Sequence, residues 1–284
     1  MENIKRMDYE WMIKPTPQSE WIEKNGIFLM LAFFLAEIGA GIYFLSMIFG
    51  LKGGMVFGWL LTLVLGGGVH MYYLGNPLRF WRIFLKPKTS ELSRGVWIIL
   101  IFAVCGFFQI IGSVALNTVY MKSIMGIICI LLIMHGFATM NTMKAIPAWN
   151  SSIVLPLSII SGLWVGYQIV EILLLKNGVL SSFGIAKLSL VMLLTYIICL
   201  VMYLWSASHS SEIASISIKD MVCGSSSKFF YTFVVCIGIL LPLLITVYSP
   251  VSSGLLVIRL LAVFIGDLAL RYILMKNAYY KPLL

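Results

Sequence analysis

The stretch "GIFLMLAFFLAEIGAGIYFLSMIFG", residues 26–50, decides the fold class of this chain. Glu37 is its one charged residue, and the other positions are apolar, aromatic or small. A spanning α-helix needs about 20 predominantly apolar residues, so this run is long enough to cross a bilayer. The residues before it, 1–25, form a mixed-charge tail without the early apolar core of a secretory signal. We therefore expect the first helix to be retained as a span.

The composition of the whole chain points the same way. Of its 284 residues, 61% are hydrophobic and 11% are charged, and the mean hydropathy is +0.99. Soluble domains carry about 25% charged residues. Too few charged side chains are present to cover a globule of this size with hydrated surface, so lipid must be the solvent for much of it. The composition predicts an integral membrane protein and excludes a soluble enzyme domain.

Further apolar runs predict additional spans, which makes eight in total. Most of the runs end at helix breakers such as Gly53-Gly54, Pro77 and Pro147. The last two spans are joined only by a turn at Ser249-Pro250, and residues 277–284 form a C-terminal tail. The expected spans are 26–50, 55–74, 94–117, 122–143, 153–176, 184–207, 228–248 and 251–275. The chain is therefore expected to be all-α.

Cations are unevenly distributed between the two sets of connections. With eight spans both termini fall on one side, which also receives the connections 75–93, 144–152 and 208–227, and this side carries most of the Lys and Arg. The opposite connections contribute mainly Lys52, Lys122 and Lys176. Cytoplasmic loops of membrane proteins carry an excess of Lys and Arg. We expect a multi-pass protein of the plasma or inner membrane with both termini in the cytoplasm.

One connection, "YLGNPLRFWRIFLKPKTSELSRGVW" (73–97), is the only stretch dense in positive charge. Its cations and one of its aromatic residues are the candidate contact groups, and two interpretations of them compete. In the first, they fix the orientation of the chain by holding anionic headgroups. In the second, they dock an acidic partner protein, because Arg and Trp offer both charge and rigid contact area. The candidate docking residues are Arg79, Trp81, Arg82, Lys86, Lys88 and Arg94.

Four titratable side chains fall inside the membrane at similar depths. At 1.5 Å per residue, Glu37, His70, His135 and Asp267 lie roughly 10 to 16 Å below the basic face. The first three sit on spans one, two and four, which short connections make neighbours. A carboxylate and two imidazoles can exchange protons and can hydrogen-bond the carbonyl oxygens of a quinone. Alternatively, each of these side chains makes only a structural hydrogen bond between helices. This interpretation is best supported for His70, which lies near its helix end.

A second, smaller group of ionisable residues lies toward the opposite face of the membrane. It consists of Glu171, Lys187 and Arg259. Residues near helix ends can snorkel to the interface, which explains such charges without a function. Arg259, eight residues into its expected helix, fits that explanation least well. Because Arg259 and Asp267 share one helix, they are the candidates for a proton path.

Cysteine and histidine usage bears on cofactors held by the chain itself. The five cysteines form no CxxC pair, which argues against an iron–sulfur cluster or a zinc site. A bis-histidine haem needs two imidazoles at one level on facing helices, and the chain has three histidines, of which His209 is in a loop. We expect no haem, iron–sulfur cluster or metal to be held by this chain.

Three stretches, "FFLAEIGAG" (33–41), the basic connection (73–97) and "IPAWNSSIVLPLSIISGLWVG" (146–166), together resemble the polysulfide reductase membrane-subunit (NrfD/PsrC-like) family. The family's signature loop is matched in order along the basic connection. "FFLAEIGAG" (33–41) resembles the first-helix motif of the family, and "IPAWNSSIVLPLSIISGLWVG" (146–166) resembles its approach to helix five. The matching loop residues are Leu74-Gly75, Pro77, Arg79-Phe80-Trp81, Pro87, Thr89-Ser90 and Ser93-Arg94-Gly95. The resemblance spans the whole chain, including the count of eight helices.

The resemblance implies a particular organisation. It implies a first four-helix bundle over 26–144, which contains a menaquinone or ubiquinone site, and a second four-helix bundle over 145–276. It also implies a ferredoxin-like iron–sulfur partner subunit, usually with a molybdopterin catalytic subunit beyond it, and no cofactor in this chain. On this basis the basic connection becomes a docking platform beside the quinone pocket.

The chain departs from the family pattern at three places. Asn76 replaces an arginine, Glu91 stands where an aromatic residue is common, and Ala36-Glu37 replaces a glycine pair. The last change places a carboxylate beside the expected pocket. Family members often dock their partners on the outer face, which conflicts with the cytoplasmic side that the cations indicate here.

The sequence therefore predicts the quinone-reactive membrane anchor of an oxidoreductase complex, with Glu37, His70 and His135 in the site. The direction of electron flow and the terminal substrate are not readable from it. One alternative is an ion-coupled secondary transporter that uses Glu37, Glu171, Asp267 and the arginines, although such proteins usually show broken helices at matching points of two repeats. Another is an inert anchor for a partner that does all the chemistry.

Overall fold

The protein is almost entirely helical in a computed structural model that describes residues 10–23, 25–74, 76–112, 118–178, 182–248 and 253–283. Seven of the described helical stretches are long and apolar enough to cross a membrane. They are Gly26–Ile48, Lys52–Tyr73, Glu91–Ile111, Val119–Asn141, Val154–Asn177, Ala186–Ser210 and Ser227–Tyr248. The chain is thus an all-α, multi-pass membrane protein, as its composition predicts.

Five of these spans are single helices, and two contain a wider π-helical segment. The single helices are α2 (Gly26–Ile48), α5 (Glu91–Ile111), α6 (Val119–Asn141), α7 (Val154–Asn177) and α8 (Ser182–Ser210). The other two are α3 (Lys52–Leu60), η1 (Leu61–Gly66) and α4 (Gly67–Tyr73), and α10 (Ser227–Phe229), η5 (Phe230–Leu240) and α11 (Leu241–Tyr248). Both π-helical segments, η1 and η5, lie inside their spans.

The eighth expected span, 251–275, differs from the other seven. A helix of 24 residues, α12 (Ser253–Lys276), is present there. It is not among the seven apolar stretches, and its interior carries Arg259, Asp267 and Arg271. The turn expected at Ser249-Pro250 lies outside the described residues.

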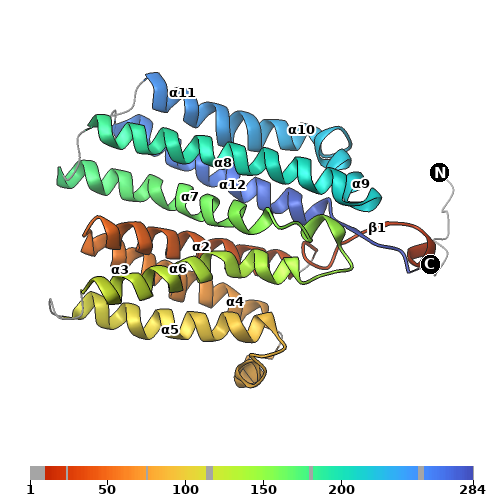
Figure 1. The fold of residues 1–284 in the computed structure, drawn as a ribbon, viewed down its shortest axis with the longest axis horizontal. Coiled ribbons are helices and arrows are strands. Elements are labelled where there is room, and N and C mark those ends of the chain that lie inside the picture. The colour runs from red at the N-terminus through yellow and green to blue at the C-terminus, as the bar shows by residue number, and fades with distance from the viewer. Residues whose placement is uncertain are drawn as a thin grey trace.

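The long helices lie side by side along one axis, with α2 and α7 next to each other in the middle (Figure 1). Helix α2 packs against α3, α6 and α7, and α12 packs against α7 and η5. Glycines bring α2 and α7 into backbone contact. A Cβ at Gly41 would meet the carbonyl oxygen of Gly162, and one at Gly166 would lie 2.8 Å from the nitrogen of Ile42. Small residues allow such close approach of helices in membranes.

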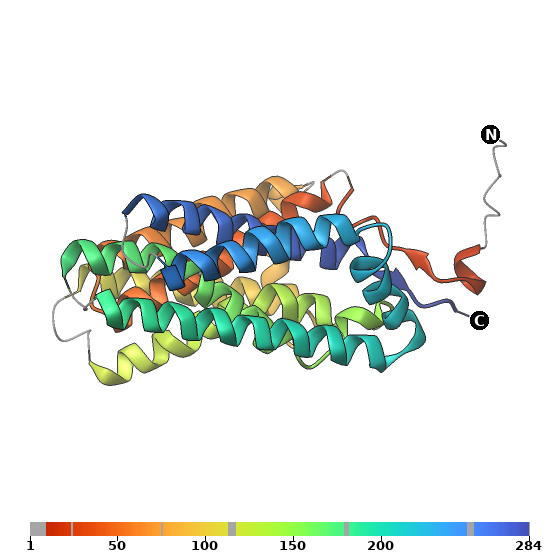
Figure 2. The ribbon, with the colours of Figure 1, turned by 90° about the horizontal axis from the view of Figure 1, so that it is seen from above.

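The two terminal segments meet at one end of the bundle. Strands β1 (Thr16–Pro17) and β2 (Tyr279–Tyr280) pair antiparallel, near the short helix α1 (Glu10–Ile13). Figure 2 shows this sheet extending beyond the ends of the long helices. The amide of Gln18 donates to the carbonyl of Ala278 at 2.8 Å, and the rings of Trp21 and Trp149 are 5.2 Å apart. The tail expected over 1–25 is therefore tied to the bundle through its described part.

Three short helices cover the same end of the bundle. They are η2 (Pro77–Leu85), η4 (Pro147–Trp149) and α9 (Glu212–Val222). The axis of η2 lies across the long helices, so Figure 1 shows it end-on as the orange coil below α4 and α5. Helix α5 begins at Glu91, where the Ser90 hydroxyl accepts from the amide of Ser93 at 3.3 Å. The connection expected over 75–93 is thus a short crosswise helix followed by the first turn of α5.

Candidate functional site

The residues that surround both membrane histidines enclose one cavity, here called the histidine cavity. Its volume is about 410 Å³, and it lies between α2, η1, α4, α5 and α6, with η2 closing it at the end that carries the basic connection. It is lined almost entirely by apolar side chains and glycine. The lining residues are Ala32, Phe33, Ala36, Leu63, Val64, Gly66, Gly67, Gly68, His70, Met71, Phe80, Ile83, Leu92, Val96, Ile99, Leu132, His135 and Gly136.

His70 and His135 bring the polar atoms into this cavity. His70 is on α4 and is half-buried, and His135 is on α6 and is 7% exposed. Phe33 of α2 packs against both rings, with centroid distances of 6.0 Å to His70 and 5.6 Å to His135. The structure therefore brings together the two histidines that the sequence places on separate spans.

Neither imidazole has a hydrogen-bond partner among the described residues. The Thr139 hydroxyl donates to His135 at 2.9 Å, but the acceptor is the main-chain carbonyl of His135. Both ring nitrogens of His135 are left without a partner by this bond. Buried polar groups in proteins are nearly always hydrogen-bonded to protein or to bound molecules. Two unpaired imidazoles facing an apolar cavity are therefore suited to a ligand that offers polar atoms on an apolar body.

Glycines create the room for the two rings. A Cβ at Gly95 of α5 would collide with the imidazole of His135. A Cβ at Gly136 would lie 2.9 Å from the Cβ of Phe33. Larger residues at either position would push His135 or Phe33 out of place, so the sequence around the cavity fixes where the two rings lie.

The wall formed by η1 and α4 opens the cavity to the outer surface. Leu63, Val64 and Gly66 line it from the π-helical turn, which is a local widening often found at functional sites. Val64 is 59% exposed and Met71 is 37% exposed, and both also line the cavity. The cavity thus reaches the lipid-facing surface beside α4.

Glu37 lies apart from the two histidines, contrary to the expected grouping. Its carboxylate is 1% exposed and accepts from Nη1 and Nη2 of Arg271 on α12, each at 2.6 Å. Ala36 lines the histidine cavity, and Glu37, the next residue, is turned about 100° around the helix toward α7 and α12. Glu37 therefore lies at a depth similar to that of the histidines, but its side chain points to a different side of α2.

Arg271 is the centre of a buried cluster that the sequence analysis did not identify. Its Nε donates to Asp267 at 3.1 Å, and its Nη2 donates to the Ser161 hydroxyl at 2.8 Å. Ser161 in turn donates to Asp267 at 2.6 Å, and the Tyr196 hydroxyl donates to Asp267 at 3.4 Å. The spacing of Asp267 and Arg271, one helical turn, is the signal that could have revealed the pair.

The second expected group is split in the structure. Arg259 is 1% exposed and pairs with Glu171 of α7. It also donates to Gln168 at 2.9 Å and to Thr246 of α11 at 3.0 Å. Lys187 is exposed. Arg259 and Asp267 lie about 12 Å apart along α12 and have separate partners. The expected proton path therefore consists of two clusters that no described side-chain bond joins.

The six expected docking residues are all exposed at the end that carries η2. Arg94 pairs with Glu91 and also donates to the carbonyls of Pro87 and Lys88 at 2.9 Å, which folds the connection back on α5. The guanidinium of Arg82 lies 5.7 Å from the ring centre of Trp81. The basic residues thus form one surface, with Arg79, Lys86 and Lys88 completing it.

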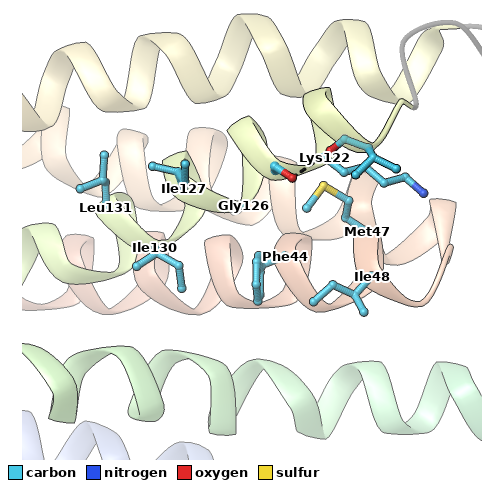
Figure 3. Close-up of a pocket in the computed structure, with 10 residues that line it drawn as sticks. Phe44, Met47, Ile48, Lys122, Gly126, Ile127, Ile130 and Leu131 are labelled. Atoms are coloured by element: carbon cyan, nitrogen blue, oxygen red, sulfur yellow. Dashed lines mark hydrogen bonds between the residues drawn. The ribbon is translucent and has the colours of Figure 1, made fainter.

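Other features of the described part of the chain offer less chemistry. It contains no cluster of three or more His, Cys, Asp or Glu that could hold a metal ion. A groove of about 560 Å³ between α2 and α6, shown in Figure 3, is lined by Phe44, Met47, Ile127 and other apolar residues. Lys122 is the only charged group among the described residues that line it. The groove lacks a pair of groups that could exchange protons, so the histidine cavity is the candidate site.

Comparison with known proteins does not add to this geometry. No protein-family model matches the chain, and no curated protein matches it. The function proposed below therefore rests on the chemistry of the histidine cavity and its surroundings.

Proposed function

We propose that this chain is the quinone-reactive membrane anchor of a multi-subunit oxidoreductase. The observation that carries the proposal is the pair of imidazoles, His70 and His135, which face an apolar, lipid-accessible cavity without partners among the described residues. A ligand that matches this cavity is apolar, arrives through lipid, and carries polar atoms on opposite sides of a small ring. Menaquinone and ubiquinone have these properties.

The chemistry of the imidazoles fits both redox forms of such a ligand. A ring N–H donates to a quinone carbonyl, and a bare ring nitrogen accepts from a quinol hydroxyl. Histidine is also the side chain best suited to exchange protons near neutral pH. Phe33, Ile99 and Leu132 supply the apolar walls, and the exposed edge at Val64 and Met71 gives the isoprenoid tail a way out into lipid. Glu37 is omitted from this site.

The proposal extends to the architecture and the family. We infer that α12 is an eighth span, because it is 24 residues long and packs against α7 and η5. The spans then form two four-helix bundles, 26–144 and 145–276, as in the polysulfide reductase membrane-subunit (NrfD/PsrC-like) family that the motifs resemble. Two motif residues support this inference, because Phe80 lines the histidine cavity and Gly95 makes room for His135.

The partner proposed for this anchor is a ferredoxin-like iron–sulfur subunit, with a molybdopterin or other catalytic subunit beyond it. Helix η2 supports docking beside the site, because Phe80 and Ile83 line the cavity while Arg79, Trp81 and Arg82 face outward. Electrons would therefore cross little more than one short helix. By the charge distribution this end is cytoplasmic, in the plasma or inner membrane.

Quinone binding to the purified chain tests the proposal. A fluorescent quinol analogue should bind the wild type, and His70→Ala and His135→Ala should each weaken binding about tenfold or more, because a lost hydrogen bond to a buried ligand costs about 1–3 kcal/mol. His209→Ala is the matched control, because His209 is exposed and stacks on Trp205 outside the cavity. Binding that is unchanged in both cavity variants would refute the site. The absorption spectrum of the same sample distinguishes a quinone site from a bis-histidine haem.

The transporter alternative draws on the buried clusters around Arg259 and Arg271. Substrate sites in such proteins are cavities near the bilayer midplane. The void beside Arg271, lined by Phe33, Gly136 and Met275 among others, is only about 10 Å³, room for one water at most. The quinone proposal is better supported, because the histidine cavity is large enough for an organic ligand.

A further inference from the structure

A second cavity adjoins the histidine cavity and is here called the vestibule. Its volume is about 340 Å³, and it lies between the N-terminal segment, α4, η2, the first turn of α5 and the end of α6. Its residues come from the same end of the molecule as the basic surface. They are Glu20, Trp21, Leu29, His70, Tyr73, Leu74, Ile83, Ser90, Glu91, Leu92, Thr139, Thr142 and Met143.

The two cavities meet at His70. His70, Ile83 and Leu92 line both of them, so one imidazole has access to the histidine cavity on one side and to the vestibule on the other. Ile83 and Leu92 are apolar, so among the described residues His70 is the only titratable side chain at the junction. A proton that passes between the two cavities at this point therefore has one side chain able to relay it.

Both cavities are lined mostly by apolar surface, and they differ in the polar side chains that they carry. Among the described residues, the histidine cavity has no ionisable group besides its two imidazoles, whereas the vestibule carries two carboxylates and three hydroxyl groups of Ser and Thr. On α6, Thr142, Thr139 and His135 follow one another at intervals of three and four residues, which places them on one face of the helix. This polar face runs from the end of the bundle to the histidine cavity.

The threonine hydroxyls are positioned to hold water. Thr139 donates to the carbonyl of His135 at 2.9 Å, and Thr142 donates to the carbonyl of Thr139 at 2.7 Å. Each oxygen keeps its lone pairs for a bond from water. A cavity of this size has room for several waters, and each water needs two or more polar partners. The hydroxyl and carboxylate groups of the vestibule can supply such partners along one side of an otherwise mostly apolar lining.

Glu20 lies at the outer end of the vestibule and is exposed. Its carboxylate accepts from the Tyr280 hydroxyl at 2.9 Å. Hydrogen bonding to its own backbone amide, followed by the bond from Tyr280, lowers the pKa of Glu20 from its ordinary value. An ionised carboxylate therefore stands where the vestibule meets the aqueous phase.

We propose that the vestibule is the water-filled route by which a quinone in the histidine cavity exchanges protons with the aqueous phase at the η2 end, with His70 as the relay and Thr139 as a positioning residue. The inference rests on the proposed function. Reduction of a quinone consumes two electrons, supplied by the redox partner, and two protons, supplied from this end, and oxidation of the quinol releases both by the same routes. The buried Glu37 cluster takes no part in this exchange.

The first test asks whether water reaches Thr139. In a chain whose five cysteines are replaced, Thr139→Cys is exposed to a charged, membrane-impermeant thiol reagent added to one side of oriented vesicles. Thr139 is 3% exposed, so its reaction requires a hydrated path. Met202→Cys is the control, because Met202 is 49% exposed on the outer surface of α8. We expect Thr139→Cys to react at least about tenfold faster than Met202→Cys, from the η2 side only. Equal rates, or reaction from the other side, would overturn the route.

The second test separates the route from quinone binding. Thr139→Val removes the hydroxyl and keeps a similar shape, and we expect about tenfold slower quinol turnover by the complex, a larger solvent deuterium effect and unchanged affinity for the quinol analogue. Thr195→Val is the matched control, because Thr195 makes the same bond to its own helix, 2.8 Å to the carbonyl of Val191, on the exposed face of α8. Unchanged turnover in Thr139→Val would overturn the inference. A wild type that binds no analogue would instead refute the proposed function, which the binding measurement shows before any vestibule variant is made.

Discussion

Arg271 shows how a single residue can be tolerated as a charge in the middle of an apolar bundle. It is 4% exposed, and its guanidinium bonds to Glu37, Asp267 and Ser161, from three different helices. Two carboxylates and one guanidinium give this cluster a formal net charge of −1. Burial of ions is costly unless they are paired and hydrogen-bonded, so the cluster is stable only while its cation is present.

Removal of that cation should destabilise the fold severely. Arg271→Met leaves two carboxylates buried without their partner, and we expect it to lower the free energy of unfolding by about 3–5 kcal/mol. Glu37→Gln keeps the shape and leaves Arg271 paired with Asp267, so its cost should be about 1 kcal/mol. Thermal unfolding in mild detergent compares the two variants. Equal losses would show that the charge balance of the cluster does not govern its stability.

The separation of Glu37 from the histidines shows what sequence reasoning can and cannot locate at this scale. Depth in the membrane follows from counting residues, and it predicts that Glu37, His70 and His135 lie in the same half of the bilayer. Direction around the helix decides which neighbour a side chain meets, and it depends on how α2 is rotated against α6, α7 and α12. The pairing of Arg271 with Glu37 could not be predicted, because the two residues are far apart in sequence and only the packing of the helices brings them together.

At the scale of elements, η2 has two faces with different surroundings. Phe80 and Ile83 line the histidine cavity, while Arg79, Trp81 and Arg82 are exposed. Leu78 is 92% exposed and Trp81 is 57% exposed, which gives the outer side apolar area beside its cations. Amphipathic segments with this composition lie in the membrane interface. Under the proposed function, the helix can therefore close the cavity with one face and bind the partner subunit with the other.

The two faces of η2 should be separable by mutation. Phe80→Ala removes a wall of the cavity, so we expect several-fold weaker binding of the quinol analogue and normal assembly. Arg82→Glu reverses one outer charge, so we expect normal quinol binding and weaker, salt-sensitive association with the iron–sulfur partner. Binding of the analogue and co-purification of iron and labile sulfide measure the two effects. Loss of both properties in each variant would mean that η2 acts as one unit.

The positions of most spanning helices can be read from the sequence, since apolar length determines them. Their internal irregularities cannot. Nothing in "LTLVLG" distinguishes the π-helical turn η1 from an ordinary α-helix, yet this turn supplies Leu63, Val64 and Gly66 to the cavity. Such widening arises from packing against neighbouring helices rather than from local propensity.

At the scale of the whole molecule, the contact between α2 and α7 joins the helices before α7 in the sequence to those after it. The backbones touch at Gly41, Gly162 and Gly166, where no larger residue fits. The eight-span count and the division into two four-helix bundles remain predictions, because the described residues provide seven apolar spans and a charged α12.

Enlarging one of these glycines should loosen the whole assembly. A Cβ at Gly166 would lie 2.8 Å from the nitrogen of Ile42 and 2.9 Å from the carbonyl carbon of Gly41. Gly166→Leu forces the two helices apart, and we expect a loss of about 1–3 kcal/mol in unfolding free energy. Gly254→Leu is the control, because no heavy atom lies within 4 Å of its Cβ position. A thermal midpoint that falls equally in both variants would argue against a special role for this contact.

The vestibule opens at the same end of the molecule that carries the basic surface of η2. This common position has an energetic consequence. An elementary charge that crosses a membrane does work of about 2.3 kcal/mol against each 100 mV of potential. When electrons and protons both reach the quinone from one side, their charges cancel there, and no net charge crosses the bilayer. Under the proposed function, turnover would then neither generate a voltage nor be slowed by one, and redox free energy alone would drive it.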